Sequence, residues 1–140
     1  MAKLFRTDRT IRFAHCDTSG VVYFVRLYEF MDAAVEDWFA QALEVSFETL
    51  QLKRRIGTPI VSNSCDFHQP LRLGERLTLE LAVRKLGRSS IELEITGKVS
   101  GEARFTARHK VAMMSLDTYR SIEIPGEIRG RAAAFLTTPG

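Results

Sequence analysis

Residues 15–24, HCDTSGVVYF, bring together several side chains that could do chemistry. They supply an imidazole at His15, a thiol at Cys16 and a carboxylate at Asp17, followed by two hydroxyl residues and Gly20. No histidine stands at a recognisable spacing to activate Cys16, and the chain has no G-x-S-x-G motif of a serine hydrolase. Asp17 remains, and its D-x-x-G context is common for an Asx turn, in which the carboxylate accepts nearby amides. The residues alone leave Asp17 between a turn and a reactive carboxylate.

The other metal-ligating and redox side chains are dispersed. His15, His68 and His109 form no H-x-H or H-E-x-x-H pattern and have no cysteine at ligand spacing, so we expect no metal site. Cys16 and Cys65 form no C-x-x-C pair, and without a secretion signal we expect both to be reduced thiols.

An amphipathic helix is predicted from about residue 23 to 43, directly after the Asp17 stretch. At about 100° per residue, its apolar side chains fall on one face: Phe24, Leu27, Tyr28, Met31, Val35, Trp38, Phe39 and Ala42. A face so broad must be covered by something large. Asp32 lies roughly 80° from the centre of this face, so we expect it at the edge of burial.

The second half of the chain changes to a period of two. Residues 76–84 and 91–95 alternate apolar and polar side chains, which predicts two half-buried strands joined by a turn at 86–90. The remaining predicted elements are strands at 5–14, 57–68 and 103–116, a short helix near 46–54 and a terminal helix within 124–136. This order indicates an α+β domain in which a curved antiparallel sheet of about five strands wraps the long helix.

Length and composition fit one ordinary globular domain over residues 1–140. The chain has 140 residues, 45% hydrophobic and 26% charged. Its net charge of +3 comes from 20 basic and 17 acidic residues, too balanced for a nucleic-acid surface, so an anionic ligand should be small and held locally. Short apolar runs and an N-terminus without a signal-peptide core predict a cytoplasmic protein that does not enter a membrane.

Three stretches resemble the hotdog-fold acyl-CoA thioesterases, in particular the 4-hydroxybenzoyl-CoA thioesterase family. They are CDTSGVVYF at 16–24, DAAVEDWF at 32–39 and GTPIVSNSCDF at 57–67. The likeness runs from about residue 10 to 117, with the motifs in the same order and spacing. It implies a hotdog fold and hydrolysis of a pantetheine thioester without a cofactor. It also implies a homodimer with sites between subunits, often doubled to a homotetramer.

The resemblance gives the stretch before the helix a catalytic role. The family's catalytic carboxylate stands at the position of Asp17, where it attacks the thioester carbonyl or acts as general base on water, and both routes stay open. The family's carbonyl-polarising amide corresponds to that of Phe24, at the positive end of the helix. Tyrosine is frequent there, so Phe24 keeps the amide but brings no hydroxyl. Gly20 is expected to give the thioester room, and Tyr23 to pack beside the substrate.

Other positions imply contacts to the two ends of the substrate. Asp32 matches the aspartate that accepts a hydrogen bond from the substrate's ring hydroxyl, which implies a hydroxyaryl acyl group, because an unpaired buried acceptor rejects other substrates. Gly57 and Thr58 are expected along the thioester or pantetheine channel.

The turn at 86–90 is flanked by Arg84, Lys85 and Arg88. The corresponding turn of the family is basic and contacts the CoA phosphates, for which arginine is well suited. Charged hairpins are also commonly just solvated, so both interpretations stay open.

The sequence therefore predicts a thioester hydrolase for an aromatic acyl-CoA such as 4-hydroxybenzoyl-CoA, with CoA as part of the substrate and no separate cofactor. One alternative is a thioesterase for 1,4-dihydroxy-2-naphthoyl-CoA or short aliphatic acyl-CoAs, which shares the start of the motif. An alternative of another class is a non-catalytic hotdog module that binds acyl-CoA. Retention of Asp17 weighs against that last possibility.

Overall fold

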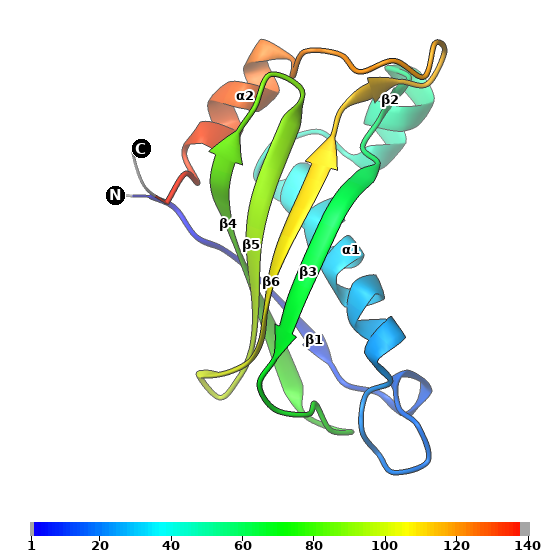
Figure 1. The fold of residues 1–140 in the computed structure, drawn as a ribbon, viewed down its shortest axis with the longest axis vertical. Coiled ribbons are helices and arrows are strands. Elements are labelled where there is room, and N and C mark those ends of the chain that lie inside the picture. Colours follow the sequence, from blue (N-terminus) through cyan, green and yellow to red (C-terminus); the bar gives the residue numbers. More distant parts are fainter. Residues whose placement is uncertain (1, 138–140) are drawn as a thin grey trace.

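A curved five-stranded antiparallel sheet covers one long helix in the computed structural model, which describes residues 2–137. The helix is α1 (Phe24–Gln41), and the strand order is β1-β4-β5-β6-β3 (Figure 1). The strands are β1 (Phe5–Thr10), β3 (Ile60–Phe67), β4 (Arg76–Leu86), β5 (Ser90–Val99) and β6 (Glu102–Ala112). The predicted α+β architecture is confirmed.

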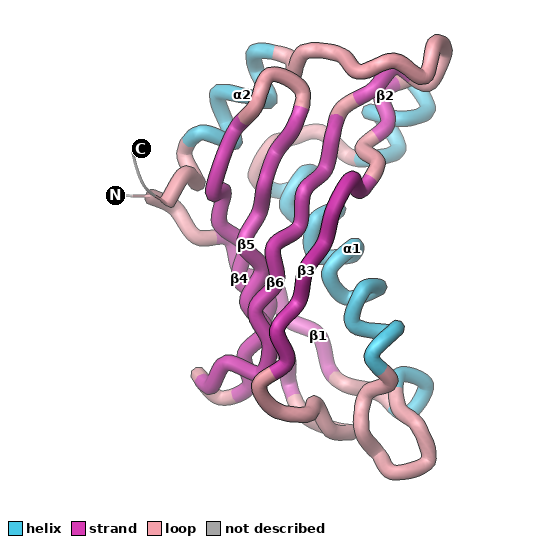
Figure 2. Tube along the Cα trace, in the orientation of Figure 1, coloured by secondary structure: helices cyan, strands magenta, loops and turns pink. Residues whose placement is uncertain are grey.

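The smaller elements lie at the ends of this sheet, where most connecting loops gather (Figure 2). They are η1 (Phe13–His15), η2 (Glu48–Lys53), β2 (Ile56–Gly57), β7 (Met114–Ser115) and α2 (Gly126–Ala133). Two predicted strands are shorter than expected, since β1 stops at Thr10 before η1, and the strand expected over 103–116 breaks after Ala112. In the described part of the chain, no helix is long and apolar enough to span a membrane.

The helix α1 buries a stripe of side chains with helical spacing: Leu27, Phe30, Met31, Ala34, Val35, Trp38 and Phe39. The expectation that Phe24 and Tyr28 are buried with this stripe is wrong within one chain, because they are 56% and 38% exposed. The reason is visible in Figure 1, where the first turns of α1 extend beyond the outline of the sheet. The apolar face of the helix therefore continues past its cover.

Strict alternation builds the other half of the core. Leu77, Leu79, Leu81 and Val83 of β4 are fully buried, and β5 contributes Ile91, Leu93 and Ile95 in the same way. At the end of β5, Gly97 faces Phe105 of β6 across the ladder. A Cβ at position 97 would lie 2.0 Å from Phe105 Cε2, so only glycine allows the ring to lie across β5.

Candidate active site

Asp17 lies in a tight turn between η1 and α1. Its Oδ1 accepts hydrogen bonds from the Ser19 amide at 2.8 Å and from the Ser19 hydroxyl at 2.5 Å, which is an Asx turn. Gly20 closes the turn with φ of +79°, a conformation that favours glycine. The turn interpretation of Asp17 is therefore confirmed, and its catalytic role stays a prediction.

The same hydrogen bonds set the charge of the carboxyl group. The Ser19 hydroxyl and amide lower the pKa of Asp17, because both donate to the charged form. Asp17 is exposed, and it is therefore an ionised carboxylate at neutral pH with its second oxygen open to a ligand. An ionised carboxylate can serve as a nucleophile or as a general base.

The loop that carries Asp17 is clamped onto the segment after β3. The Val22 amide donates to the Leu71 carbonyl at 2.8 Å, and the Leu73 amide donates to the Gly20 carbonyl at 2.9 Å. These bonds fix the start of α1. Tyr23 is the N-cap residue of the helix and gives it no side-chain hydrogen bond. The Phe24 amide has no hydrogen-bond acceptor within residues 2–137, so it is free to donate to a ligand.

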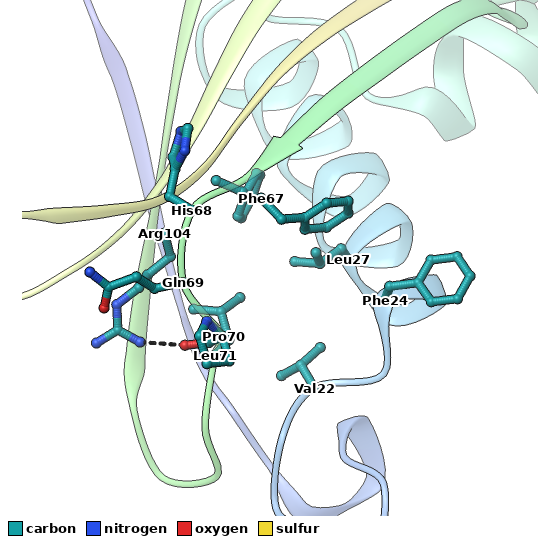
Figure 3. A pocket seen from close by; sticks show the side chains of 10 residues that line it. Val22, Phe24, Leu27, Phe67, His68, Gln69, Pro70, Leu71 and Arg104 are labelled. Atoms are coloured by element: carbon teal, nitrogen blue, oxygen red, sulfur yellow. Dashed lines mark hydrogen bonds between the residues drawn. The ribbon is translucent and has the colours of Figure 1, made fainter.

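A cavity of about 350 Å³ opens beside this helix start (Figure 3). Val22 from the loop, Leu27 from α1 and Phe67 from the end of β3 face it. Its floor includes Arg104, whose guanidinium is satisfied by Glu75 at 2.9 Å and by the Pro70 carbonyl at 2.7 Å. We call this space the helix-start cavity. Its walls are mostly apolar, which suits an acyl or pantetheine chain.

A second cavity, of about 360 Å³, lies further along α1 and near the beginning of β3. Its lining includes Asp32 from α1, Thr58 from the segment before β3, Ile60 from β3 and His109 from β6. We call it the Asp32 cavity. Within one chain Asp32 is exposed. The expectation that it lies at the edge of burial is therefore wrong for the single chain. The fold does bring two predicted substrate-binding residues, Asp32 and Thr58, to one space.

The structure gives a packing reason for Gly57 and places Tyr23 at the surface; both were predicted to bind substrate. Gly57 is buried in β2, and a Cβ there would lie 2.8 Å from Leu116 Cδ2, so close packing requires the glycine. Tyr23 is 52% exposed, with its ring 5.2 Å from the ring of Phe24. Contact of either residue with a substrate stays a prediction.

The basic hairpin lies far from the Asp17 loop. Arg84 pairs with Glu94 at 3.7 Å, whereas Lys85 and Arg88 have exposed side chains. Figure 1 places the β4–β5 hairpin at the end of the sheet next to α2, and the loop before α1 at the opposite end. One chain therefore does not gather all predicted site residues, because the acid and the CoA-binding basic side chains are separated by the length of the sheet.

Cys65 does not supply a second nucleophile. Burial, with a small contribution from Asp66, raises the pKa of the Cys65 thiol to about 11. Cys65 is therefore a protonated thiol at neutral pH, and a protonated thiol is a poor nucleophile. Within residues 2–137, no group of three or more His, Cys, Asp and Glu side chains is arranged to hold a metal ion.

The fold and the motif together define a hotdog protein of the thioester hydrolase class. The model of the thioesterase-like superfamily matches residues 11–132, which is most of the chain. The protein therefore belongs to the thioesterase-like superfamily. The predicted family and enzyme class are confirmed.

Two curated relatives are similar over most of their length. The 1,4-dihydroxy-2-naphthoyl-CoA hydrolase of Nostoc punctiforme is 29% identical over 126 residues, covering 89% of this chain and 83% of the relative. The 4-hydroxybenzoyl-CoA thioesterase of Pseudomonas sp. is 26% identical over 135 residues, covering 91% and 96%. Both relatives act, by name, on CoA esters of hydroxylated aromatic acids.

A solved structure agrees on the fold. The crystal structure of a 1,4-dihydroxy-2-naphthoyl-CoA thioesterase from Synechocystis superposes with a TM-score of 0.85 at 21% identity, covering 98% of this chain and all of the other. At that identity the likeness supports the hotdog fold alone.

One side chain in the Asp32 cavity was missed by sequence reasoning. His109 is 1% exposed and lines the cavity with Asp32. In the sequence it stands as an isolated histidine, but it shares the period-two phase of Phe105, Ala107 and Val111, all of which are buried. That alternation was the available signal for an inward-facing polar residue.

Proposed function

We propose that the protein hydrolyses the thioester of a hydroxylated aromatic acyl-CoA, with Asp17 as the reactive carboxylate. The observation that carries the proposal is one local arrangement at the start of α1. An ionised, exposed carboxylate is held in an Asx turn of the loop that leads into α1, and the helix begins with Phe24, whose amide has no acceptor within residues 2–137 and which lines an apolar cavity. Carboxylate, oxyanion donor and apolar wall are the three parts that acyl transfer needs.

In this proposal the thioester carbonyl accepts a hydrogen bond from the Phe24 amide, which stabilises the negative charge that develops on the oxygen. Asp17 then either attacks the carbonyl carbon, releasing CoA thiolate and leaving a mixed anhydride for water to hydrolyse, or removes a proton from the attacking water. Gly20 presents no side chain at the turn, and the space where its Cβ would lie is open. That opening would admit the thioester.

We propose further that the working protein is a homodimer joined along β3. This strand is an edge of the sheet and leaves one row of backbone groups free to pair with another strand. It exposes Ile60, Val61 and Phe67, which are 48%, 52% and 54% exposed. A second copy of the chain would cover these side chains as well as the exposed start of α1.

A two-fold axis through β3 would also complete the site. Antiparallel pairing of two β3 strands brings the Phe67 end of one copy next to the Ile60 end of the other. Phe67 lines the helix-start cavity, and Ile60 lines the Asp32 cavity. The two cavities would then adjoin across the interface, with the thioester at Asp17 of one copy and the aromatic ring near Asp32 of the other.

The hydroxyaryl part of the proposal is supported by Asp32 and by the relatives. Asp32 gives the second cavity a carboxylate acceptor, and both curated relatives act, by name, on acyl groups that carry a ring hydroxyl. A 4-hydroxybenzoyl or a 1,4-dihydroxy-2-naphthoyl group would satisfy that acceptor. Binding of the CoA phosphates by Arg84, Lys85 and Arg88, assembly into a homotetramer, and a cytoplasmic location stay predictions.

A thiol-release assay tests the proposal. The substrates are 4-hydroxybenzoyl-CoA, 1,4-dihydroxy-2-naphthoyl-CoA, benzoyl-CoA and a short aliphatic acyl-CoA, each with the wild type, Asp17→Asn and Asp117→Asn. Asp117 is an exposed aspartate that pairs with Arg55 and serves as the matched control. We expect loss of activity by about 100-fold or more in Asp17→Asn alone. Background rates for the wild type on every substrate would refute the enzyme and favour an acyl-CoA-binding module.

A further inference from the structure

The inner face of the sheet carries a buried histidine that the proposed mechanism does not use. Among the described residues, Arg104 and His109 are the buried charged or polar side chains. Arg104 is fully satisfied by Glu75, Glu102 and a backbone carbonyl. His109 differs, because its Nε2 is shielded from water and has no hydrogen-bond partner within residues 2–137.

The partner of the other ring nitrogen fixes the tautomer of His109. Asn63 stands opposite His109 in the β3–β6 ladder, and its Nδ2 lies 2.9 Å from His109 Nδ1 and 3.9 Å from Met31 Sδ. Both amide hydrogens of Asn63 thus have an acceptor, the Met31 thioether and His109 Nδ1, whereas Asn63 Oδ1 is buried without a partner among the described residues. We assign Nδ1 as the acceptor from this network, so the proton is on Nε2.

His109 is neutral in this setting. Burial lowers its pKa, and the charge of Asp32 opposes this effect only in part. A neutral ring with its proton on Nε2 is a hydrogen-bond donor without an acceptor. An unsatisfied buried donor is costly. Trp38 Nε1 and Asn63 Oδ1 are also buried without a partner among the described residues, but of these three residues only His109 lines one of the two cavities, where a ligand could supply the acceptor.

Asp32 and His109 both line the Asp32 cavity, and they offer opposite halves of a hydrogen-bond pair. Asp32 accepts, and His109 Nε2–H donates. A phenolic hydroxyl group has one proton to give and lone pairs to accept with, so it can bond to both residues at once. Neither a plain aromatic ring nor an aliphatic chain can bond to either.

We propose that His109 is a specificity-determining residue that binds the ring hydroxyl of the acyl group together with Asp32. The hydroxyl donates to the Asp32 carboxylate and accepts from His109 Nε2–H, while Asn63 holds the ring in the required tautomer. The inference rests on the proposed thioesterase function and deepens it, because it assigns a second contact to the hydroxyl. Asp32 is exposed and forms no hydrogen bond or ion pair with another described residue, so its carboxylate is free to accept from a ligand in the cavity.

The test measures kcat/KM for 4-hydroxybenzoyl-CoA and benzoyl-CoA with the wild type, His109→Phe and His109→Gln. The phenylalanine keeps the ring shape and removes the donor, whereas the glutamine keeps a donor. We expect the preference for the hydroxylated substrate to fall about tenfold in His109→Phe. It should recover in part in His109→Gln, and in both variants kcat/KM should fall less for benzoyl-CoA than for 4-hydroxybenzoyl-CoA. A merely structural role would lower both rates together.

A second substrate separates the two halves of the contact. The 4-methoxybenzoyl thioester can accept from His109 but cannot donate to Asp32. In His109→Phe it should lose its remaining advantage over benzoyl-CoA, whereas in Asp32→Ala it should keep that advantage. The opposite pattern would overturn the assignment of donor and acceptor.

Two outcomes distinguish a failure of the His109 contact from a failure of the proposed thioesterase function. If the wild type hydrolyses none of these thioesters, the proposed function has failed. If it hydrolyses them and His109→Phe keeps the wild-type preference, the role of His109 is refuted and the thioesterase stands.

A measurement on the wild type covers the case in which His109→Phe does not fold. The chain has 3 histidines, so the ring nitrogens can be followed by NMR after labelling with 15N-histidine. With saturating CoA, 4-hydroxybenzoate should shift the His109 Nε2 resonance and benzoate should not. Equal shifts with the two acids, or no shift with either, would refute the contact.

Discussion

The two edge strands of the sheet, β1 and β3, offer opposite surfaces to another chain. On β1, Arg6, Asp8 and Arg9 each form an ion pair with a side chain of β4 or α1, at 3.0, 3.0 and 2.5 Å. These charged side chains belong to an edge strand, whose free backbone groups could otherwise pair with a strand of another chain. Charged side chains are a common way to keep a sheet edge from pairing.

On β3 the side chains are different. No residue of Ile60–Phe67 forms an ion pair with another described residue, and the strand exposes Ile60, Val61 and Phe67. The charged side chains of β1 are thus bonded within the chain, whereas β3 is the edge at which we propose that a second copy binds. This difference suggests separate roles for the two edges: the ion pairs of β1 stabilise the fold, and in the proposed dimer β3 completes the site.

The largest effect is expected from a charge on the open edge. In Val61→Glu, a carboxylate would have to be desolvated at the proposed interface, so we expect monomers. Activity should fall by about 100-fold, because the two halves of the site no longer meet. Thr10→Glu, at an exposed position of β1, is the matched control and should remain dimeric and active. Size-exclusion chromatography with light scattering measures the oligomeric state, and the thiol-release assay measures the activity. A fully active Val61→Glu monomer would contradict the proposed role of the β3 edge.

A complementation experiment asks whether the site is shared across β3. Asp17→Asn removes the reactive group, and Asp32→Trp fills the cavity at the other half. Each homodimer should be inactive, but co-expression should restore about a quarter of wild-type activity, because each mixed dimer has one intact site. Differently tagged chains allow the mixed dimer to be isolated. No recovery in the isolated mixed dimer would place both residues in a site within one chain.

A substitution of Asp37, the α1 residue that bonds to the β1 edge strand, should affect stability alone. Asp37 on α1 accepts hydrogen bonds from Arg9 at 2.5 Å and from Thr7 at 2.9 Å on β1. Asp37→Asn should lower the free energy of unfolding by about 1 kcal/mol, measured by urea unfolding. The oligomeric state and kcat/KM should stay at wild-type values. A change in either would mean that β1 also belongs to the functional surface.

The smallest effect concerns Asp8 and pH. The Thr78 hydroxyl, and then Arg76, lower the pKa of Asp8. This group therefore adds stability above the pKa of the unfolded chain, and that stability is lost as pH falls through the folded-state pKa. Because Asp8 is largely solvated, Asp8→Asn should cost only about 0.5 kcal/mol at pH 7. The difference from the wild type should vanish in acid; a difference that persists at low pH would exclude a charge effect.

The sequence was sufficient to locate the helices and strands, but it could not predict how much of α1 the sheet covers. Alternation over 76–84 and 91–95 located the buried strands, because one face of each strand must meet the core. A helical wheel, however, has no information about how far a sheet extends along a helix. Phe24 and Tyr28 therefore looked like core residues, although their turns lie beyond the sheet within one chain.

The site was predictable to a similar degree. The D-x-x-G motif identified the Asp17 turn and the start of α1, since both are local features. The Asp32 cavity is not local, because Asp32 and His109 meet only through the β3–β6 ladder and the packing of α1 against the sheet. Partners so distant in sequence are set by tertiary packing, and neither spacing nor composition could pair them.

Gly97 gives the helix-start cavity a hidden determinant. Phe105 lines that cavity, and its ring also lies against Gly97. A methyl group at position 97 would displace this ring and so change the wall of the cavity. Gly97 does not itself line the cavity. A substitution at position 97 could therefore change which acyl groups fit without contacting any of them.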